Sequence, residues 1–110
     1  MMRARRKWEE IGREILTKVL DAVDYWCQYV SGDPPSECYA AHADMGLYEL
    51  AEMYMESTYG PTRRDLVLLK RMPKSVYEKL EAKLVAELER LAAEMREEEE
   101  EEEAEEEEML

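Results

Sequence analysis

Apolar residues recur every three or four positions through most of this chain, and this spacing constrains its fold more than any other feature. Residues 5–30 contain two adjacent series of this kind, and later segments repeat the pattern. The first series, which we expect to be buried, is Trp8, Ile11, Ile15, Val19, Ala22, Trp26 and Tyr29. Side chains three or four positions apart lie on one face of an α-helix, whereas the side chains of a strand alternate between faces. Two neighbouring apolar series make a wide face, which is typical of a helical bundle. We therefore predict an all-α fold, a helical bundle of three long helices plus one short helix, with an acidic C-terminal tail.

Gly and Pro residues divide the periodic segments. The turn at residues 31–35 contains a glycine, which can close a helix, and two prolines, which cannot continue one. Gly60 and Pro61 form a second boundary, and Thr62 with Asp65 resembles a capping box at the start of the short helix. The helices that we expect are residues 5–30, 36–58, 63–71 and a last helix that starts near Lys74 or Ser75.

The net charge of −13 is concentrated at the C-terminal end. Eleven of the last fourteen residues are glutamates, and the other 96 residues carry 17 acidic and 15 basic side chains. Like charges four residues apart oppose a helix, and carboxylates at its C-terminus oppose the helix dipole. We assign residues 1–96 to a helical domain and residues 97–110 to a poly-Glu tail, which is either a helical extension or disordered.

Length and composition indicate the class of protein. A chain of 110 residues corresponds to one domain. No apolar stretch approaches the roughly 18 residues that span a membrane, and no secretory signal is recognisable, so we expect a cytoplasmic protein with no membrane partner. The chain has no Asn and one Gln among many charged residues, which favours a heat-adapted source, although eight methionines argue against it.

Two cysteines and one histidine form the first candidate site. Cys27 lies one turn before the end of the first helix, and Cys38 lies in the first turn of the second. A helical hairpin brings those turns together, so a disulfide is geometrically reasonable and would add about 3 kcal/mol of stability. The alternatives are two buried free thiols, or a metal site in which His42 joins both cysteines. A structural zinc site usually has four ligands, and the sequence has no fourth Cys or His.

Carboxylate pairs form the second candidate site. Asp21 and Asp24 lie on the first helix, and Glu49 and Glu52 on the second. Acidic pairs on neighbouring helices can supply oxygen ligands to Mg²⁺. This arrangement resembles that of the all-helical nucleotide pyrophosphatases of the MazG type, although Asp stands where Glu is usual on the first helix. The resemblance implies a Mg²⁺-dependent nucleotide pyrophosphohydrolase. Both pairs fall on the polar sides of their helices, which favours a solvated acidic face instead.

Two further surfaces are candidates for contacts with partners. Basic residues flank the short helix and could neutralise phosphates, but a pI of about 4.5 makes nucleic acid a secondary partner. The acidic tail could also dock on this basic patch, which consists of Arg63, Arg64, Lys70, Arg71 and Lys74. Methionines around the circumference of the second helix suit an adaptable interface, and they are Met45, Met53 and Met55.

The sequence contains no Gly-rich phosphate loop and no nucleophile–base arrangement, so our interpretation leans against an enzyme. We interpret the chain as a non-enzymatic interaction protein: an adaptor, an assembly subunit or a charge-mimicking regulator. It would act through an apolar helical face and the acidic tail, on a basic protein or on another copy of itself as a homo-oligomer. No cofactor is expected, except Mg²⁺ under the pyrophosphohydrolase alternative. A small helical subunit of a nucleoprotein complex is the remaining alternative.

Overall fold

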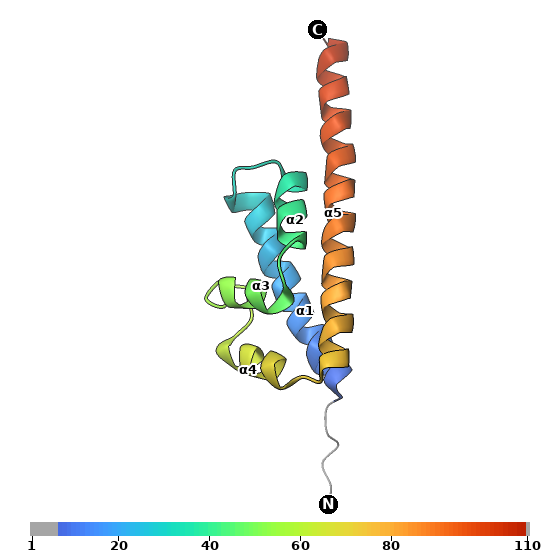
Figure 1. Ribbon diagram of the computed structural model, residues 1–110. Coiled ribbons are helices and arrows are strands. Elements are labelled where there is room, and N and C mark those ends of the chain that lie inside the picture. The colour runs from blue at the N-terminus through green and yellow to red at the C-terminus, as the bar shows by residue number, and fades with distance from the viewer. Residues whose placement is uncertain (1–6, 110) are drawn as a thin grey trace, which may run out of the picture.

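The computed structural model describes the backbone of residues 7–109 and the side chains of residues 7–102 (Figure 1). Every regular element in this part of the chain is helical, which confirms the all-α prediction. The elements are α1 (Trp8–Tyr25), the π-helical turn η1 (Trp26–Val30), α2 (Pro35–Ala43), α3 (Leu47–Met53), α4 (Arg63–Arg71) and α5 (Lys74–Met109).

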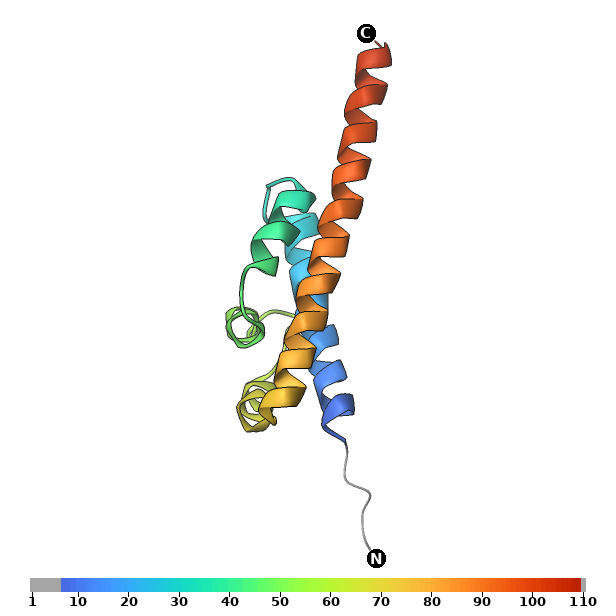
Figure 2. The ribbon, with the colours of Figure 1, turned by 45° about the vertical axis from the view of Figure 1, so that its right-hand side comes forward.

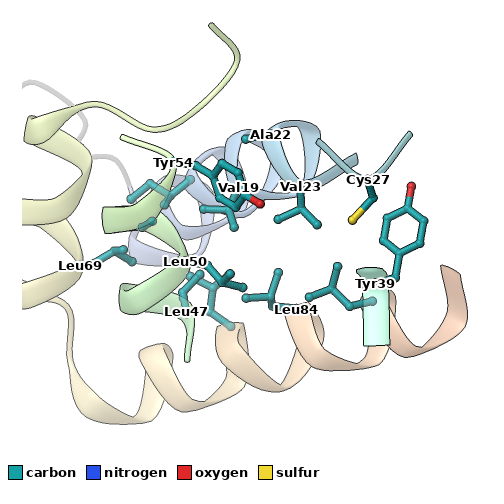
Figure 3. Packing of buried hydrophobic residues seen from close by; sticks show 14 of the residues in the cluster. Val19, Ala22, Val23, Cys27, Tyr39, Leu47, Leu50, Tyr54, Leu69 and Leu84 are labelled. Atoms are coloured by element: carbon teal, nitrogen blue, oxygen red, sulfur yellow. The ribbon is translucent and has the colours of Figure 1, made fainter. Parts of the chain in front are cut away.

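The long helix α5 supports the rest of the molecule. It packs along both α1 and α2, while α3 and α4 lie toward its N-terminal end (Figures 1 and 2). The apolar series of α1 and α5 face each other, and the shorter helices close the core between them (Figure 3). The largest fully buried side chains include Ile15, Val19, Val23, Tyr39, Leu47, Leu50, Leu84 and Leu88.

The prediction of one continuous helix over residues 36–58 is wrong. The chain leaves the helical conformation after α2, and α3 starts only at Leu47, after the extended residue Gly46. The reason is tertiary: the Leu47 N–H donates to the Glu81 carboxylate over 2.8 Å. A Cβ atom at position 46 would lie 3.3 Å from that same carboxylate, so glycine permits the close approach. The break directs Leu47 and Leu50 into the core, where both are fully buried.

Two glutamates of α5 satisfy the N-termini of α2 and α3, neither of which has a side-chain cap of its own. Glu81 accepts from the start of α3, and Glu99 accepts from both the N–H and the hydroxyl of Ser36, over 3.2 and 2.6 Å. Eighteen residues are about five turns, so Glu81 and Glu99 lie on one face of α5. Negative charge near a helix N-terminus is favourable because the exposed N–H groups carry a partial positive charge.

The first helix reaches Val30 as predicted, but its last turn is a π-helix. The Ser31 N–H donates to the carbonyl oxygen of Trp26, five residues earlier, over 2.9 Å. A π-turn contains more residues than an α-turn, so the side chains that follow it leave the register of the preceding apolar series. Trp26 and Tyr29, which the spacing places in the buried series, are 42% and 79% exposed. That part of the prediction is wrong.

The short helix α4 has the predicted bounds and the predicted capping box. The Asp65 N–H donates to the Thr62 hydroxyl, and the Thr62 N–H donates to the Asp65 carboxylate. The same carboxylate accepts from Lys18 of α1 over 2.9 Å, although Asp65 is buried. Burial alone would raise the pKa of Asp65, but the Thr62 backbone amide and the Lys18 ammonium outweigh it and lower that pKa.

The poly-Glu tail, which we call the acidic segment from here on, is helical: residues 97–109 continue α5 as far as Met109. Glu99 contacts the body through α2, and beyond it the helix projects past the other elements (Figure 1). The helix α4 lies near the opposite end of α5 (Figure 1). The sequence had left open that the tail docks on the basic patch of its own chain. In the part of the acidic segment that the structure describes, the glutamates lie away from α4, so they do not make this contact.

Candidate functional site

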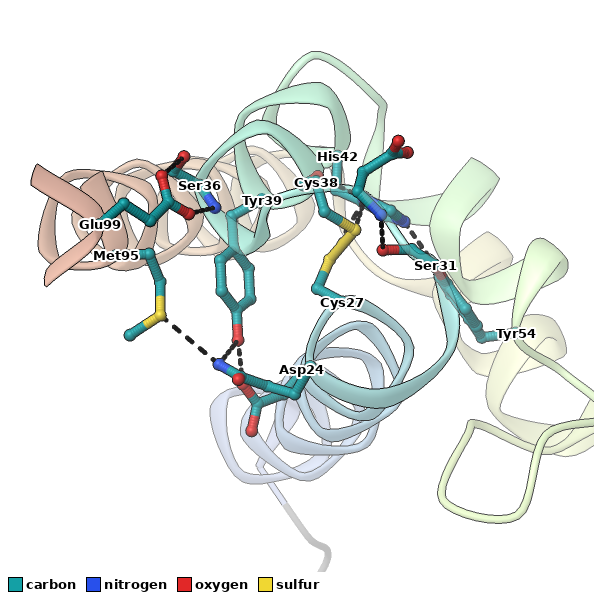
Figure 4. Close-up of a disulfide and its surroundings, with 12 residues drawn as sticks. Asp24, Cys27, Ser31, Ser36, Cys38, Tyr39, His42, Tyr54, Met95 and Glu99 are labelled. Carbon is teal, nitrogen blue, oxygen red and sulfur yellow. Dashed lines mark hydrogen bonds between the residues drawn. A yellow bond between two sulfur atoms is a disulfide. The ribbon is translucent and has the colours of Figure 1, made fainter. Parts of the chain in front are cut away.

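The two cysteines meet between η1 and α2 (Figure 4). Their Cα atoms are 5.5 Å apart and their sulfur atoms form a disulfide. Both side chains are buried. Of the three arrangements that the sequence left open, this is the one that the structure contains.

His42 lies against this disulfide, one turn along α2 from Cys38 (Figure 4). Its Nδ1 atom is 3.8 Å from the Cys38 sulfur and 4.0 Å from the Cys27 sulfur, and 2.7 Å from the Cys38 carbonyl oxygen. Its Nε2 atom is 2.5 Å from the Tyr54 hydroxyl. Burial raises the pKa of Tyr54 to about 12, so this hydroxyl keeps its proton at neutral pH.

Within the described part of the chain, Cys27, Cys38 and His42 are the group of potential metal ligands whose donor atoms converge, all within 4.8 Å of one another. The four carboxylates of the predicted Mg²⁺ site, Asp21, Asp24, Glu49 and Glu52, are exposed and form no such group. Asp24 instead accepts a hydrogen bond from Tyr39, whose pKa is raised to about 12 by burial and by this contact.

Three tyrosines gather on the surface beside η1, and the sequence did not predict that they would share a site. The ring of Tyr25 lies 5.5 Å from that of Tyr29 and 5.8 Å from that of Tyr59, between centroids. We call Tyr25, Tyr29 and Tyr59 the tyrosine cluster. About half or more of each side chain is exposed. Together with Asp21 and Asp24, the cluster lines a hollow of about 260 Å³. No local signal marks this site, because the π-turn and a distant loop assemble it.

The same two aspartates also line a second hollow, of about 270 Å³, on the side toward α5. Glu87 and Leu91 of α5 belong to its wall. Asp21 and Asp24 therefore connect the tyrosine cluster to the surface of α5. Arg90 pairs with Glu87 and Glu94 and lowers the pKa of Glu87.

The predicted interface methionines do not form one exposed set. Met53 is 52% exposed, whereas Met45 and Met55 are half-buried against the core. The five residues of the predicted basic patch are all exposed, on α4 and at the start of α5. Lys70 lies over the ring of Tyr48, and Lys74 pairs with Glu78.

No family model, curated protein or solved structure matches this chain. Among the helices that the structure describes, none is long and apolar enough to cross a membrane.

Proposed function

We propose that this protein is a non-enzymatic interaction protein that binds a basic protein partner through the tyrosine cluster and the acidic part of α5. One observation carries the proposal: three exposed tyrosines share a hollow with two aspartates. These aspartates continue the surface onto the helix that ends in the poly-Glu segment.

The chemistry of the hollow suits a Lys or Arg side chain. Aromatic faces attract cations, and exposed contacts of this kind contribute about 0.5–1 kcal/mol each. Asp21 and Asp24 add negative charge beside the rings. The Tyr39 hydroxyl donates to Asp24 and so holds its carboxylate in place. Trp26 and Val30, which follow Tyr25 and Tyr29 in the sequence, are also exposed, and aromatic residues are enriched among the residues that dominate the energetics of protein interfaces.

The acidic helix contributes in a different way. Up to Arg96, basic side chains are interspersed with the glutamates of α5, as where Arg90 pairs with Glu87 and Glu94. After Arg96 the sequence contains eleven glutamates and no basic residue. Exposed charges of one sign accelerate association with an oppositely charged partner, and salt screens them over about 10 Å at 0.1 M. We assign the acidic segment to attraction and the tyrosine cluster to short-range contact.

Anisotropy of a fluorescein-labelled oligoarginine peptide, at low and high salt, tests this division. We expect Tyr29→Ala and Tyr59→Ala to weaken binding several-fold at both salt concentrations. The cation–π contacts form at short range and do not involve the acidic segment, whose attraction salt screens. Deletion of residues 100–110 should weaken binding mainly at low salt. Val67→Ala is the matched control, since Val67 is also exposed but lies on α4.

If both tyrosine variants bind like the wild type at both salt concentrations, the proposal fails. Light scattering distinguishes a second copy of this chain as the occupant. If the wild type is a dimer and Tyr29→Ala is a monomer that binds the peptide as well as the wild type does, the tyrosine cluster serves self-association. That result would overturn the proposal of a basic partner.

A further inference from the structure

We propose that, once reduced, Cys27 and Cys38 bind Zn²⁺ together with His42, so that one buried position alternates between a disulfide and a metal site. This inference is independent of the tyrosine cluster and of the basic partner. It rests on the convergence of two sulfurs and one imidazole nitrogen inside the protein.

The distances already approach those of a zinc site. Bonds of about 2.3 Å to sulfur and about 2.0–2.1 Å to nitrogen at a tetrahedral angle place sulfur and nitrogen about 3.6 Å apart. The Nδ1 atom of His42 lies 3.8 and 4.0 Å from the two sulfurs. The distances from Nδ1 to the sulfurs therefore need little change, but the ring has to turn so that its Nδ1 lone pair points at the metal and no longer at the Cys38 carbonyl oxygen. The sulfurs, once released from each other, have to separate to about 3.8 Å.

The surroundings of His42 suit both states. In the disulfide state, a proton on Nδ1 donates to the Cys38 carbonyl oxygen, and the Tyr54 hydroxyl donates to Nε2. In the zinc state, Nδ1 offers its lone pair to the metal and the proton lies on Nε2, where the Tyr54 oxygen accepts it. A hydroxyl both donates and accepts, so the contact persists in either direction. Metal-bound histidines regularly have such a partner on the second nitrogen.

The backbone places both cysteines close to the loop that joins η1 to α2. Cys27 lies in the π-turn η1, a conformation that is frequent at functional sites. Cys38 lies in the first turn of α2, directly after the loop that contains Gly32 with φ of +76°. Both cysteines therefore lie near the ends of their elements, where small shifts leave the long helices intact.

The conversion balances with a dithiol as reductant. The dithiol transfers two electrons and two protons, the bond between the two sulfurs breaks, two thiols form, and the reductant becomes its own disulfide. Zn²⁺ then takes the place of the two thiol protons, which leave to solvent. Three protein ligands leave one position of the tetrahedron for water, as in zinc sites with an open position.

Cobalt(II), a spectroscopic substitute for zinc, tests the inference on the full chain. After anaerobic reduction and removal of the reductant, we expect one Co²⁺ per chain with thiolate charge-transfer bands, and its displacement by Zn²⁺. The oxidised chain should show neither. His42→Gln keeps both cysteines and should weaken metal binding at least tenfold. Tyr54→Phe should weaken metal binding about 10–100-fold, because it removes the hydrogen-bond partner of the His42 Nε2 atom. Tyr77→Phe is the matched control, because the Tyr77 hydroxyl donates to Glu81 and takes no part in the metal site.

Two results would overturn the inference: a reduced chain that stays helical but shows no cobalt bands, or undiminished binding by His42→Gln. If reduction unfolds the chain, recovery of helicity on adding Zn²⁺ supports the site, and failure to recover refutes it.

Discussion

The two ends of the helical body are stabilised by different kinds of contact. At the α4 end, Thr62 and Asp65 satisfy each other three residues apart, and Lys18 adds one ion pair. At the other end, a disulfide joins residues 11 apart, and the hydrogen bond from Ser36 to Glu99 spans 63 residues. The comparison indicates that one end depends on a capping box with an ion pair to α1, and the other on a disulfide and a hydrogen bond to α5. Redox conditions should therefore affect the disulfide end alone, whereas Asp65 makes the α4 end sensitive to pH.

The largest effect should come from removing the disulfide. On the chain-entropy model, a bridge that closes a loop of this length contributes about 3 kcal/mol. We expect reduction, or Cys38→Ser, to lower the free energy of unfolding by about this amount, measured in urea with a chelator present. Reduction should have no effect on the variant. Hydrogen exchange should speed up around η1 and α2 while α4 keeps its protection. If hydrogen exchange speeds up equally in α4, the two ends of the body do not depend on different contacts.

Asp65→Ala should have the next largest effect, because it removes the capping box and the partner of Lys18. A lost helix cap costs about 0.5–2 kcal/mol, and exchange should now increase in α4 rather than in α2. The pKa of Asp65 is lowered on folding, so its contribution is present above the ordinary value of 3.8 and is lost as the pH falls through the folded value.

Melting temperatures followed from neutral to acidic pH check this sign. The difference between wild type and Asp65→Ala should shrink as the pH falls below about 4. Asp65→Asn keeps the side-chain oxygen and serves as the control for charge. If the difference in melting temperature between wild type and Asp65→Ala stays constant down to the most acidic pH, the charge of Asp65 does not contribute as described.

Glu99→Ala should destabilise less, by about 1 kcal/mol, because it leaves the Ser36 N–H at the start of α2 without its acceptor. Glu81→Ala is the matched variant on the same face of α5, and its effect should appear in α3. Exchange measured residue by residue separates the two. If both variants loosen the same helix, the assignment of one glutamate to each helix is wrong.

Deletion of residues 103–110 should have the smallest effect, within about 0.5 kcal/mol, because it leaves Glu99 and the whole core in place. Thermal melts of the truncated and full chains make the comparison. A large loss of stability would show that the acidic segment supports the body, and would weaken its assignment to partner attraction.

Local signals made part of the fold predictable. Apolar residues that recur every three or four positions indicated helices, and Thr62 with Asp65 indicated the start of α4. Both signals arise from residues within one or two turns of each other. The turn between the first two helices also placed Cys27 near Cys38. The candidate metal ligands could thus be identified before their geometry was known.

The tertiary structure alone decided the features that depend on distant partners. The break before Leu47 follows from Glu81, and the cap of α2 follows from Glu99, a residue that looks like any other in an acidic run. The π-turn exposes Tyr29, and the loop before α4 brings Tyr59 to the same cluster. Amino-acid spacing by itself determined which faces of the helices are apolar. Which polar group satisfies a free helix end depended on how α5 packs against segments far away in the chain, and which aromatic rings stay outside depended on the π-turn and on the loop before α4.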